Sequence, residues 1–184
     1  MQSSAQAPLI HVRGEEEPIG IGFDAVAAYH GQSALAMLAI TFQGLRASLA
    51  LLSPDAPPSR VALTVVSGHP GPGVRDAFEF VTRAVTRNAY TVDRSLPDAR
   101  LNSKADISYS FRISLDGETV QAALRDNVLP QRFFDLVTMR NRMEAEVAEL
   151  SALKRRIALT ALALAPETLF VMRRMKNPGG QTLA

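Results

Sequence analysis

The sequence contains no cysteine among its 184 residues. This absence excludes a thiol nucleophile, a zinc–thiolate site, an iron–sulfur cluster and a disulfide framework. The sequence also has little excess of either charge, because 20 basic and 18 acidic side chains leave a formal net charge of only +2. A dedicated nucleic-acid-binding protein normally presents a basic patch or stripe, so we expect no nucleic-acid partner.

Targeting and membrane signals are equally sparse. Residues 1–7 are polar and lack the apolar centre of a secretory signal peptide. The apolar stretch at residues 157–165 is far shorter than the roughly 20 residues that a membrane-spanning helix needs. We therefore expect a cytoplasmic protein without a membrane partner.

The composition is that of a folded domain. Hydrophobic residues make up 47% of the chain and charged residues 21%, close to the averages for globular proteins. A chain of this length removes enough surface from water to form one substantial core. The charge run at residues 15–17, followed by Pro18, predicts a flexible N-terminal arm over residues 1–20. We expect one domain over residues 21–176 and a short tail at 177–184.

Helical spacing of apolar residues begins after the predicted arm. It predicts a short helix, a break at Gly31 and a longer helix that is capped near Ser33 and ends before Pro54. The residues that carry this spacing are Phe23, Val26, Ala27, Leu35, Leu38, Phe42, Leu45, Leu49 and Leu52.

A strand, a glycine-rich loop and a helix follow. The aliphatic run at residues 61–66 is typical of a strand buried on both faces, and it leads into the loop at residues 68–73. A helix is predicted next, then another short strand at residues 89–92. The apolar side of that helix consists of Val74, Ala77, Phe78, Val81 and Val85.

The strongest local signal is a β-hairpin. Apolar and polar residues alternate from Ile107 to Leu115, Asp116-Gly117 has the composition of a two-residue turn, and the chain returns through residues 120–124. Residues 131–163 and 167–175 then have helical patterns. The predicted fold is α+β, with a mixed or antiparallel sheet, a long N-terminal helix packed on it and a C-terminal helical pair.

The glycine-rich loop has two interpretations. Backbone N–H groups of such loops bind anions at the start of a helix, which would make Gly71, Gly73 and Arg75 an anion site. The loop matches neither the Walker pattern nor Gly-x-Gly-x-x-Gly, and Pro70 and Pro72 each remove a donor. We expect a tight connection, with the anion site as the alternative.

Two histidines stand at the ends of predicted elements, where sites are commonly built. His30, His69 and Asp76 have the chemistry of a zinc or iron site, while hydrogen-bonded structural histidines are the alternative. Ser67, His69 and Asp76 also have the composition of a catalytic triad, but the sequence contains no Gly-x-Ser-x-Gly elbow to support one.

The segment at residues 29–36 resembles the FmdE-like domain of formylmethanofuran dehydrogenase and its relatives, in which His-Gly-His-x-Cys-Pro-Gly opens a long helix. His30 and Gly31 match that motif, whereas Gln32 stands in place of the second histidine and Ala34 in place of the cysteine. The resemblance extends in layout over residues 23–175.

A second motif of that family, Cys-x-x-Asp-Ala, is matched at Asp76 and Ala77, with Gly73 in place of the cysteine. Thr82 and Thr86 also stand at threonine positions of the family. The resemblance implies a compact α+β homodimer with a cleft where the His-Gly helix meets the strand–helix loop. Because the cysteines are metal ligands in the family, it implies at best a weaker site of harder ligands here.

These observations predict a homodimeric accessory protein that binds a small molecule or cofactor in that cleft. Its ligand-binding residues would be His30, Gln32, Gly71, Gly73 and Arg75. The first alternative is an enzyme in which a divalent metal such as zinc or iron, held by His30, His69 and Asp76, activates water.

A second alternative is a module that binds a partner through its C-terminal helices. An apolar stripe on residues 131–163 must pack either on the domain or on another subunit. The stripe consists of Leu136, Val137, Met143, Val147, Leu150, Leu153 and Ile157.

Overall fold

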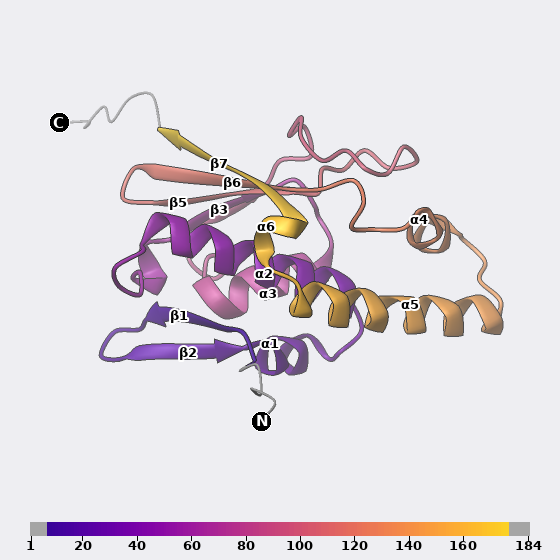
Figure 1. Ribbon diagram of the computed structural model, residues 1–184, viewed down its shortest axis with the longest axis horizontal. Coiled ribbons are helices and arrows are strands. Elements are labelled where there is room, and N and C mark those ends of the chain that lie inside the picture. Colours follow the sequence, from indigo (N-terminus) through magenta and orange to yellow (C-terminus); the bar gives the residue numbers. More distant parts are fainter. Residues whose placement is uncertain (1–6, 177–184) are drawn as a thin grey trace.

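A computed structural model describes residues 7–176 and has the predicted α+β architecture, with a five-stranded mixed sheet in the order β4-β3-β5-β6-β7 (Figure 1). Residues 1–6 of the predicted arm and the whole predicted tail at residues 177–184 lie outside the described residues. The elements are β1 (Leu9–Arg13), β2 (Pro18–Gly22), α1 (Phe23–His30), α2 (Leu35–Leu52), a 3-10 turn (Arg60–Ala62), β3 (Thr64–Ser67), α3 (Pro72–Thr82), β4 (Tyr90–Val92), β5 (Ser110–Leu115), β6 (Glu118–Leu124), α4 (Gln131–Thr138), α5 (Glu144–Ala163), α6 (Pro166–Leu169) and β7 (Phe170–Lys176).

The predicted hairpin is confirmed as β5 and β6, although β5 begins at Ser110 rather than at Ile107. Leu115 pairs with Glu118, which leaves Asp116 and Gly117 as the two turn residues. Their φ angles are 49° and 83°, as a type I′ turn requires of both central residues. On the other side of β5, β3 pairs antiparallel with it and parallel with β4, so the sheet is mixed.

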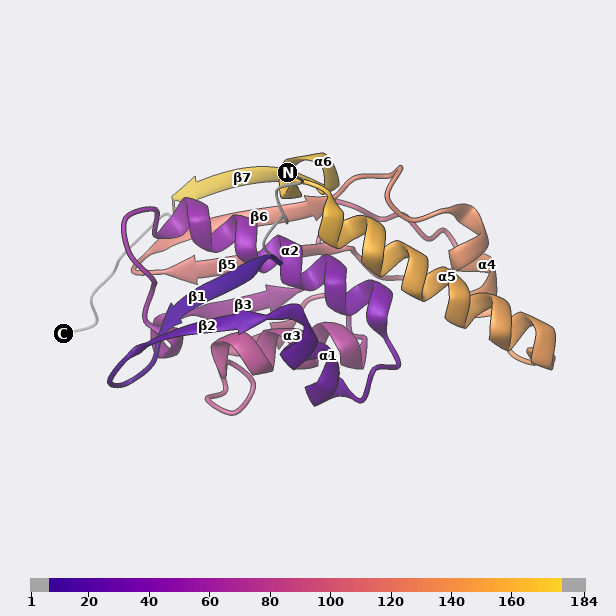
Figure 2. The ribbon, with the colours of Figure 1, turned by 60° about the horizontal axis from the view of Figure 1, so that its bottom comes forward.

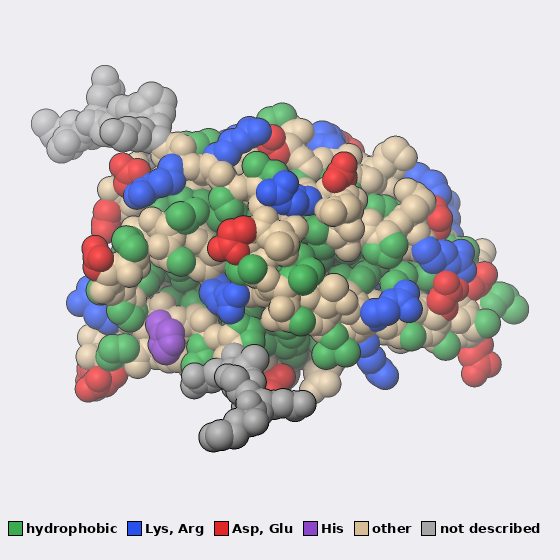
Figure 3. All heavy atoms as spheres, viewed as in Figure 1, with side chains coloured by type: hydrophobic (Ala, Val, Ile, Leu, Met, Phe, Trp, Pro, Cys, Tyr) green, Lys and Arg blue, Asp and Glu red, His purple; other side chains and the backbone are tan. Residues whose placement is uncertain are grey.

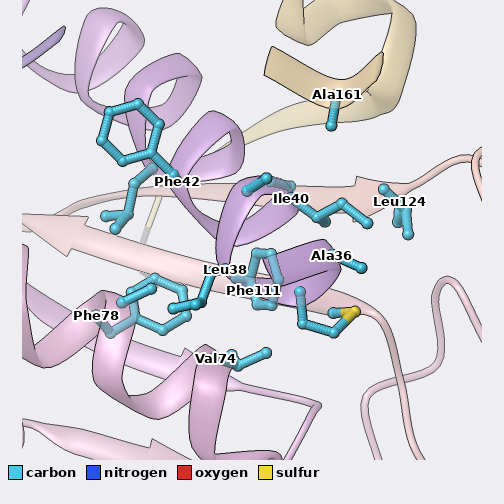
Figure 4. Packing of buried hydrophobic residues seen from close by; sticks show 14 of the residues in the cluster. Ala36, Leu38, Ile40, Phe42, Val74, Phe78, Phe111, Leu124 and Ala161 are labelled. Atoms are coloured by element: carbon cyan, nitrogen blue, oxygen red, sulfur yellow. The ribbon is translucent and has the colours of Figure 1, made fainter. Parts of the chain in front are cut away.

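The long helix α2 packs on this sheet, as predicted. Gly44 allows the close approach, because a Cβ atom there would lie 3.1 Å from the Phe170 ring and 3.4 Å from the Phe111 ring. Leu38 and Phe42 of α2 meet Phe78 of α3 in the same core, and none of these side chains is exposed (Figure 4). The sheet, α2 and α3 therefore share one hydrophobic core.

The N-terminal segment corrects the predicted flexible arm. Strands β1 and β2 pair antiparallel with each other, and they lie on the side of α2 and α3 away from the large sheet (Figures 1 and 2). Ile10, Val12 and Ile21 are buried in the main core. The charge run at residues 15–17 lies in the hairpin turn, where acidic side chains remain in water.

Three further predicted boundaries are wrong. Residues 61–66 do not form one buried strand, because the chain first makes a 3-10 turn in which Val61 is 54% exposed, and the strand covers Thr64–Ser67. Residues 131–163 form two helices, separated at residues 139–143. Residues 170–175 are not helical but extend the sheet as β7, paired antiparallel with β6.

The C-terminal half of α5 packs on α2, while its N-terminal half and α4 project from the rest of the domain (Figure 1). Within the predicted apolar stripe, Leu150, Leu153 and Ile157 are buried, whereas Met143 and Val147 are 73% and 50% exposed. The stripe is therefore only partly covered by this chain.

Helix α2 is long and apolar enough to cross a membrane by length and composition, and 67% of that stretch is buried inside the protein. A core helix passes the same test, so this feature is weak evidence for a membrane span. On the face drawn in Figure 3, basic and acidic side chains are interspersed and form no broad field of one sign.

Candidate functional site

His30, Ser33 and Asp76 form a chain of two side-chain hydrogen bonds. His30 Nδ1 lies 2.8 Å from Asp76 Oδ2, and His30 Nε2 lies 3.2 Å from Ser33 Oγ. The side chains of His30 and Asp76 are 8% and 23% exposed, whereas Ser33 is an exposed residue. The chain thus runs from a partly buried carboxylate through a buried imidazole to an accessible hydroxyl.

A tight backbone turn places Ser33 beside His30. Helix α1 ends in a Schellman motif, in which the N–H groups of Gly31 and Gln32 donate to carbonyls of the preceding turn at 3.1 and 3.0 Å. Both residues have left-handed backbone angles, with φ of 78° and 61°. Gln32, a predicted ligand residue, is exposed, and its left-handed angle helps to reverse the chain.

Asp76 lies in α3 and links that helix to the end of α1. Its second carboxylate oxygen lies 3.6 Å from Arg75, whose side chain is 53% exposed. The predicted pair of His30 and Asp76 is therefore brought together, but by a direct hydrogen bond rather than around a shared ligand.

The glycine-rich loop is held by its own side chains. Ser67 Oγ donates to the His69 carbonyl at 2.9 Å and accepts from the His69 N–H at 3.1 Å. The Gly71 N–H donates to His69 Nδ1 at 2.9 Å. A Cβ atom on Gly73 would lie 2.6 Å from the Ala34 Cβ. These contacts support the interpretation of the loop as a tight connection. The Gly71 N–H, a donor that an anion would need, already bonds His69, and Gly73 has no room for a side chain.

The triad of Ser67, His69 and Asp76 that can be read from the sequence does not form. Ser67 bonds the backbone of His69 rather than its ring, and Asp76 bonds His30. The predicted metal site of His30, His69 and Asp76 is not assembled either. Within residues 7–176, no cluster of three or more His, Cys, Asp or Glu side chains is placed to hold a metal ion.

His69 points its ring toward the core side of the loop. It makes an edge-to-face contact with Tyr109 at a centroid distance of 5.0 Å, and burial lowers the pKa of His69 to about 4. Because Nδ1 accepts the Gly71 N–H, the proton of the neutral ring is on Nε2. Burial likewise raises the pKa of Tyr109 to about 12, despite a hydrogen bond with Asn102.

A pocket of about 290 Å³ opens beside this pair, and we refer to it as the Tyr109 pocket. It lies where the start of α2, the glycine-rich loop, residues 102–109, α4 and α5 meet. Most of the lining side chains are apolar. The lining consists of Ala34, Ala36, Met37, His69, Asn102, Ala105, Ile107, Tyr109, Phe133, Val137, Thr138 and Lys154.

Lys154 is the one cation among these lining residues. Its ammonium group donates to the Ser33 carbonyl at 3.2 Å, and desolvation, followed by the nearby charge of Arg142, lowers the pKa of Lys154. The pocket thus combines apolar walls with a partly desolvated positive charge.

The sequence pattern marks His30, His69 and Asp76 as site residues, but it does not mark Ser33 or most of the residues that line the Tyr109 pocket. Ser33 carries a usable signal, since a serine three residues after a histidine across a helix end is within reach of its ring. It does not cap α2, whose cap residue Ala34 makes no side-chain hydrogen bond. Asn102, Tyr109 and Lys154 give no local signal, because only the tertiary fold brings them beside His69.

Neither a comparison with protein-family models nor one with curated proteins finds a match for this chain. The resemblance to the FmdE-like domain of formylmethanofuran dehydrogenase therefore stays a prediction that rests on its motif residues alone.

Proposed function

We propose that the protein binds a small, mainly apolar molecule that carries a carbonyl or carboxylate oxygen, and that the Tyr109 pocket is its site. The observation that supports this most strongly is the combination of apolar walls with Lys154 in one pocket. Ligand pockets are characteristically apolar concavities with a few polar groups that fix orientation.

The walls favour an uncharged ligand body. Met37, Ile107 and Phe133 line the pocket together with His69, whose pKa of about 4 keeps its ring neutral near pH 7. A volume of about 290 Å³ is at the small end of ligand pockets, which suits a short acyl chain or a single substituted ring.

The polar groups favour an oxygen-bearing end on that ligand. The Lys154 ammonium already donates to the Ser33 carbonyl and has two further N–H donors. Burial deprives the Lys154 ammonium of part of its hydration. A carboxylate or carbonyl oxygen beside it would therefore accept hydrogen bonds that water no longer accepts. The other polar groups of the lining are His69 Nε2–H, the Asn102 amide and the hydroxyls of Tyr109 and Thr138.

The binding experiment uses 8-anilinonaphthalene-1-sulfonate, an aromatic anion whose fluorescence rises in apolar surroundings, with hexanoate as the competitor. We expect saturable binding that hexanoate reverses. Ala105→Trp, on a loop that lines the pocket, should weaken binding by at least about tenfold, which corresponds to about 1.4 kcal/mol. Ala152→Trp on the exposed face of α5 is the matched control. Equal affinities for the two variants would contradict the proposal.

We also propose that two copies associate through the projecting part of α4 and α5. Support comes from Met143 and Val147, which are 73% and 50% exposed at neighbouring turns of one apolar stripe. Light scattering after size exclusion should give a dimer for the unmodified chain and a monomer for Val147→Glu. A monomer at every concentration of the unmodified chain would refute the dimer.

A further inference from the structure

We infer that Ser33, His30 and Asp76 form a hydrolytic triad that cleaves an ester whose acyl group occupies the Tyr109 pocket. The inference rests on the proposed binding function, because the pocket supplies the acyl specificity. It goes beyond that function by assigning a nucleophile, a base and a reaction.

The two hydrogen bonds have the order that nucleophilic catalysis needs. A serine hydroxyl must reach an imidazole nitrogen, and the other nitrogen must be oriented by a third group. Here Ser33 Oγ lies 3.2 Å from His30 Nε2, and His30 Nδ1 lies 2.8 Å from Asp76 Oδ2. The Asp76 carboxylate accepts the Nδ1–H, so the Nε2 lone pair faces the serine hydroxyl.

The solvent exposure of the hydrogen-bonded side chains also fits this chemistry. The His30 side chain is 8% exposed and is thus shielded from water that would compete for Nε2, whereas Ser33 is open to a substrate. A histidine–aspartate pair that only joined two helices would need no third member. The left-handed angles of Gly31 and Gln32 impose the turn that places Ser33 on the imidazole, and a left-handed angle at a non-glycine residue such as Gln32 is a form of backbone strain that clusters at functional sites.

Ser33 stands at the edge of the Tyr109 pocket. The next residue, Ala34, lines the pocket, and Lys154 both lines it and donates to the Ser33 carbonyl. We therefore place the carbonyl end of a bound acyl chain beside Lys154, on the side of the pocket next to Ser33. The Lys154 ammonium and the uncapped first turn of α2, which begins at Leu35, are the groups that favour the negative charge on that carbonyl oxygen.

The reaction balances with water as the second reactant. Ser33 Oγ bonds to the acyl carbon while its proton passes to His30 Nε2. The carbon–oxygen bond to the alcohol then breaks, and the alcohol takes the proton from Nε2. Water attacks the Ser33 ester, gives one proton to Nε2, and the bond to Oγ breaks as Ser33 recovers that proton. The products are a carboxylic acid and an alcohol, and no electrons are transferred to an acceptor.

The kinetic test follows hydrolysis of p-nitrophenyl butyrate. Ser33→Ala should lower kcat/KM by at least about 100-fold relative to the unmodified chain. Ser151→Ala, at an exposed serine of α5, is the control and should leave the rate unchanged. Asp76 is a positioning residue, so Asp76→Asn should lower kcat with KM unchanged. Hydrolysis that survives Ser33→Ala would overturn the triad.

The covalent test uses a fluorophosphonate probe, which labels activated serines. Peptide mass spectrometry should find the label on Ser33 in the unmodified chain, with reduced labelling in Asp76→Asn. No label on Ser33 at saturating probe would overturn the inference. Labelling elsewhere but not at Ser33 would do the same.

The two proposals fail in different ways. Ser33→Ala should retain binding of 8-anilinonaphthalene-1-sulfonate, because Ser33 is not among the pocket's lining residues, and Ala105→Trp should lose both binding and hydrolysis. Binding without Ser33-dependent hydrolysis refutes the triad and leaves the binding function intact. Hydrolysis that needs Ser33 but is unaffected by Ala105→Trp refutes the assignment of the acyl group to the pocket.

Discussion

Lowering the pH from about 7.5 to about 4.5 should destabilise the folded protein through His69 by about 2–3 kcal/mol. The imidazole is buried against Tyr109, and its Nδ1 accepts the Gly71 N–H. Protonation would place a positive charge in apolar surroundings. It would also turn Nδ1 from an acceptor into an N–H donor that faces the Gly71 N–H. The structure therefore disfavours the charged ring for two independent reasons.

The direction and size of this stability change follow from the pKa shift of His69. His69 has a pKa of about 4 when folded, against an ordinary value of 6.5, so between those pH values the unfolded chain binds a proton that the folded chain does not. This contribution to stability is present above pH 6.5 and is lost progressively as the pH falls toward 4. One pKa unit corresponds to about 1.4 kcal/mol, and at pH 4.5 the unfolded imidazole is protonated while the folded one is still mostly neutral, so the loss of stability is about 2–3 kcal/mol.

The assay compares urea unfolding of the unmodified chain and of His69→Asn at both pH values. Asparagine places an oxygen near the position of Nδ1 and keeps an acceptor for Gly71, but it does not titrate. The unmodified chain should lose about 2–3 kcal/mol more than His69→Asn on acidification. His11→Asn, at an exposed histidine of β1, is the control. Equal losses in the unmodified chain and in His69→Asn would refute the argument.

Three other substitutions, one of them with a matched control, test the fold by urea unfolding. Gly117→Val should cost about 1 kcal/mol or more, because Gly117 has a φ of 83° in the hairpin turn, and a neutral result would contradict the type I′ turn. Phe111→Ala removes a fully buried ring and should cost about 3–5 kcal/mol, so a loss below about 1 kcal/mol would place that face outside the core. Ile10→Ala should cost about 2–5 kcal/mol, while Leu9→Ala, at a residue that is 38% exposed, should cost little. Similar costs for these two would contradict the packing of the N-terminal hairpin.

Local patterns predict the elements whose geometry is set locally. The β5–β6 hairpin follows from alternation plus Asp116-Gly117, since the turn type depends on those two residues alone. Helix α3 follows from the spacing of Val74, Ala77 and Phe78, all of which are buried, although it ends at Thr82, before the predicted Val85. In both cases the sequence pattern and the tertiary burial agree.

Other elements depend on partners far along the chain. The strand β7 contains charged and apolar residues in an order that suits a helix as well as a strand, and its pairing with β6 decides between them. Strands β1 and β2 are short, and the acidic turn between them has the composition of a solvated arm. They are ordered because Ile10 and Val12 complete the core.

The candidate site divides in the same way. The bond between His30 and Ser33 is local, three residues apart across a helix end. The bond from His30 to Asp76 spans 46 residues, and the Tyr109 pocket gathers side chains from five separate segments. A sequence pattern marks polar residues at element ends, but it does not tell which of them share a cavity. For that reason the sequence alone groups His69 with His30 rather than with Tyr109.

Ligand binding in the Tyr109 pocket is tested most directly by backbone NMR shift mapping with hexanoate titrated into the protein. Saturable shifts should cluster around His69, Ala105, Tyr109 and Lys154, which lie in segments that line the Tyr109 pocket. Saturable shifts confined to another pocket would contradict binding in the Tyr109 pocket; an example is the pocket that Leu9 lines between β1 and the end of α2. The absence of any saturable shift would also contradict it.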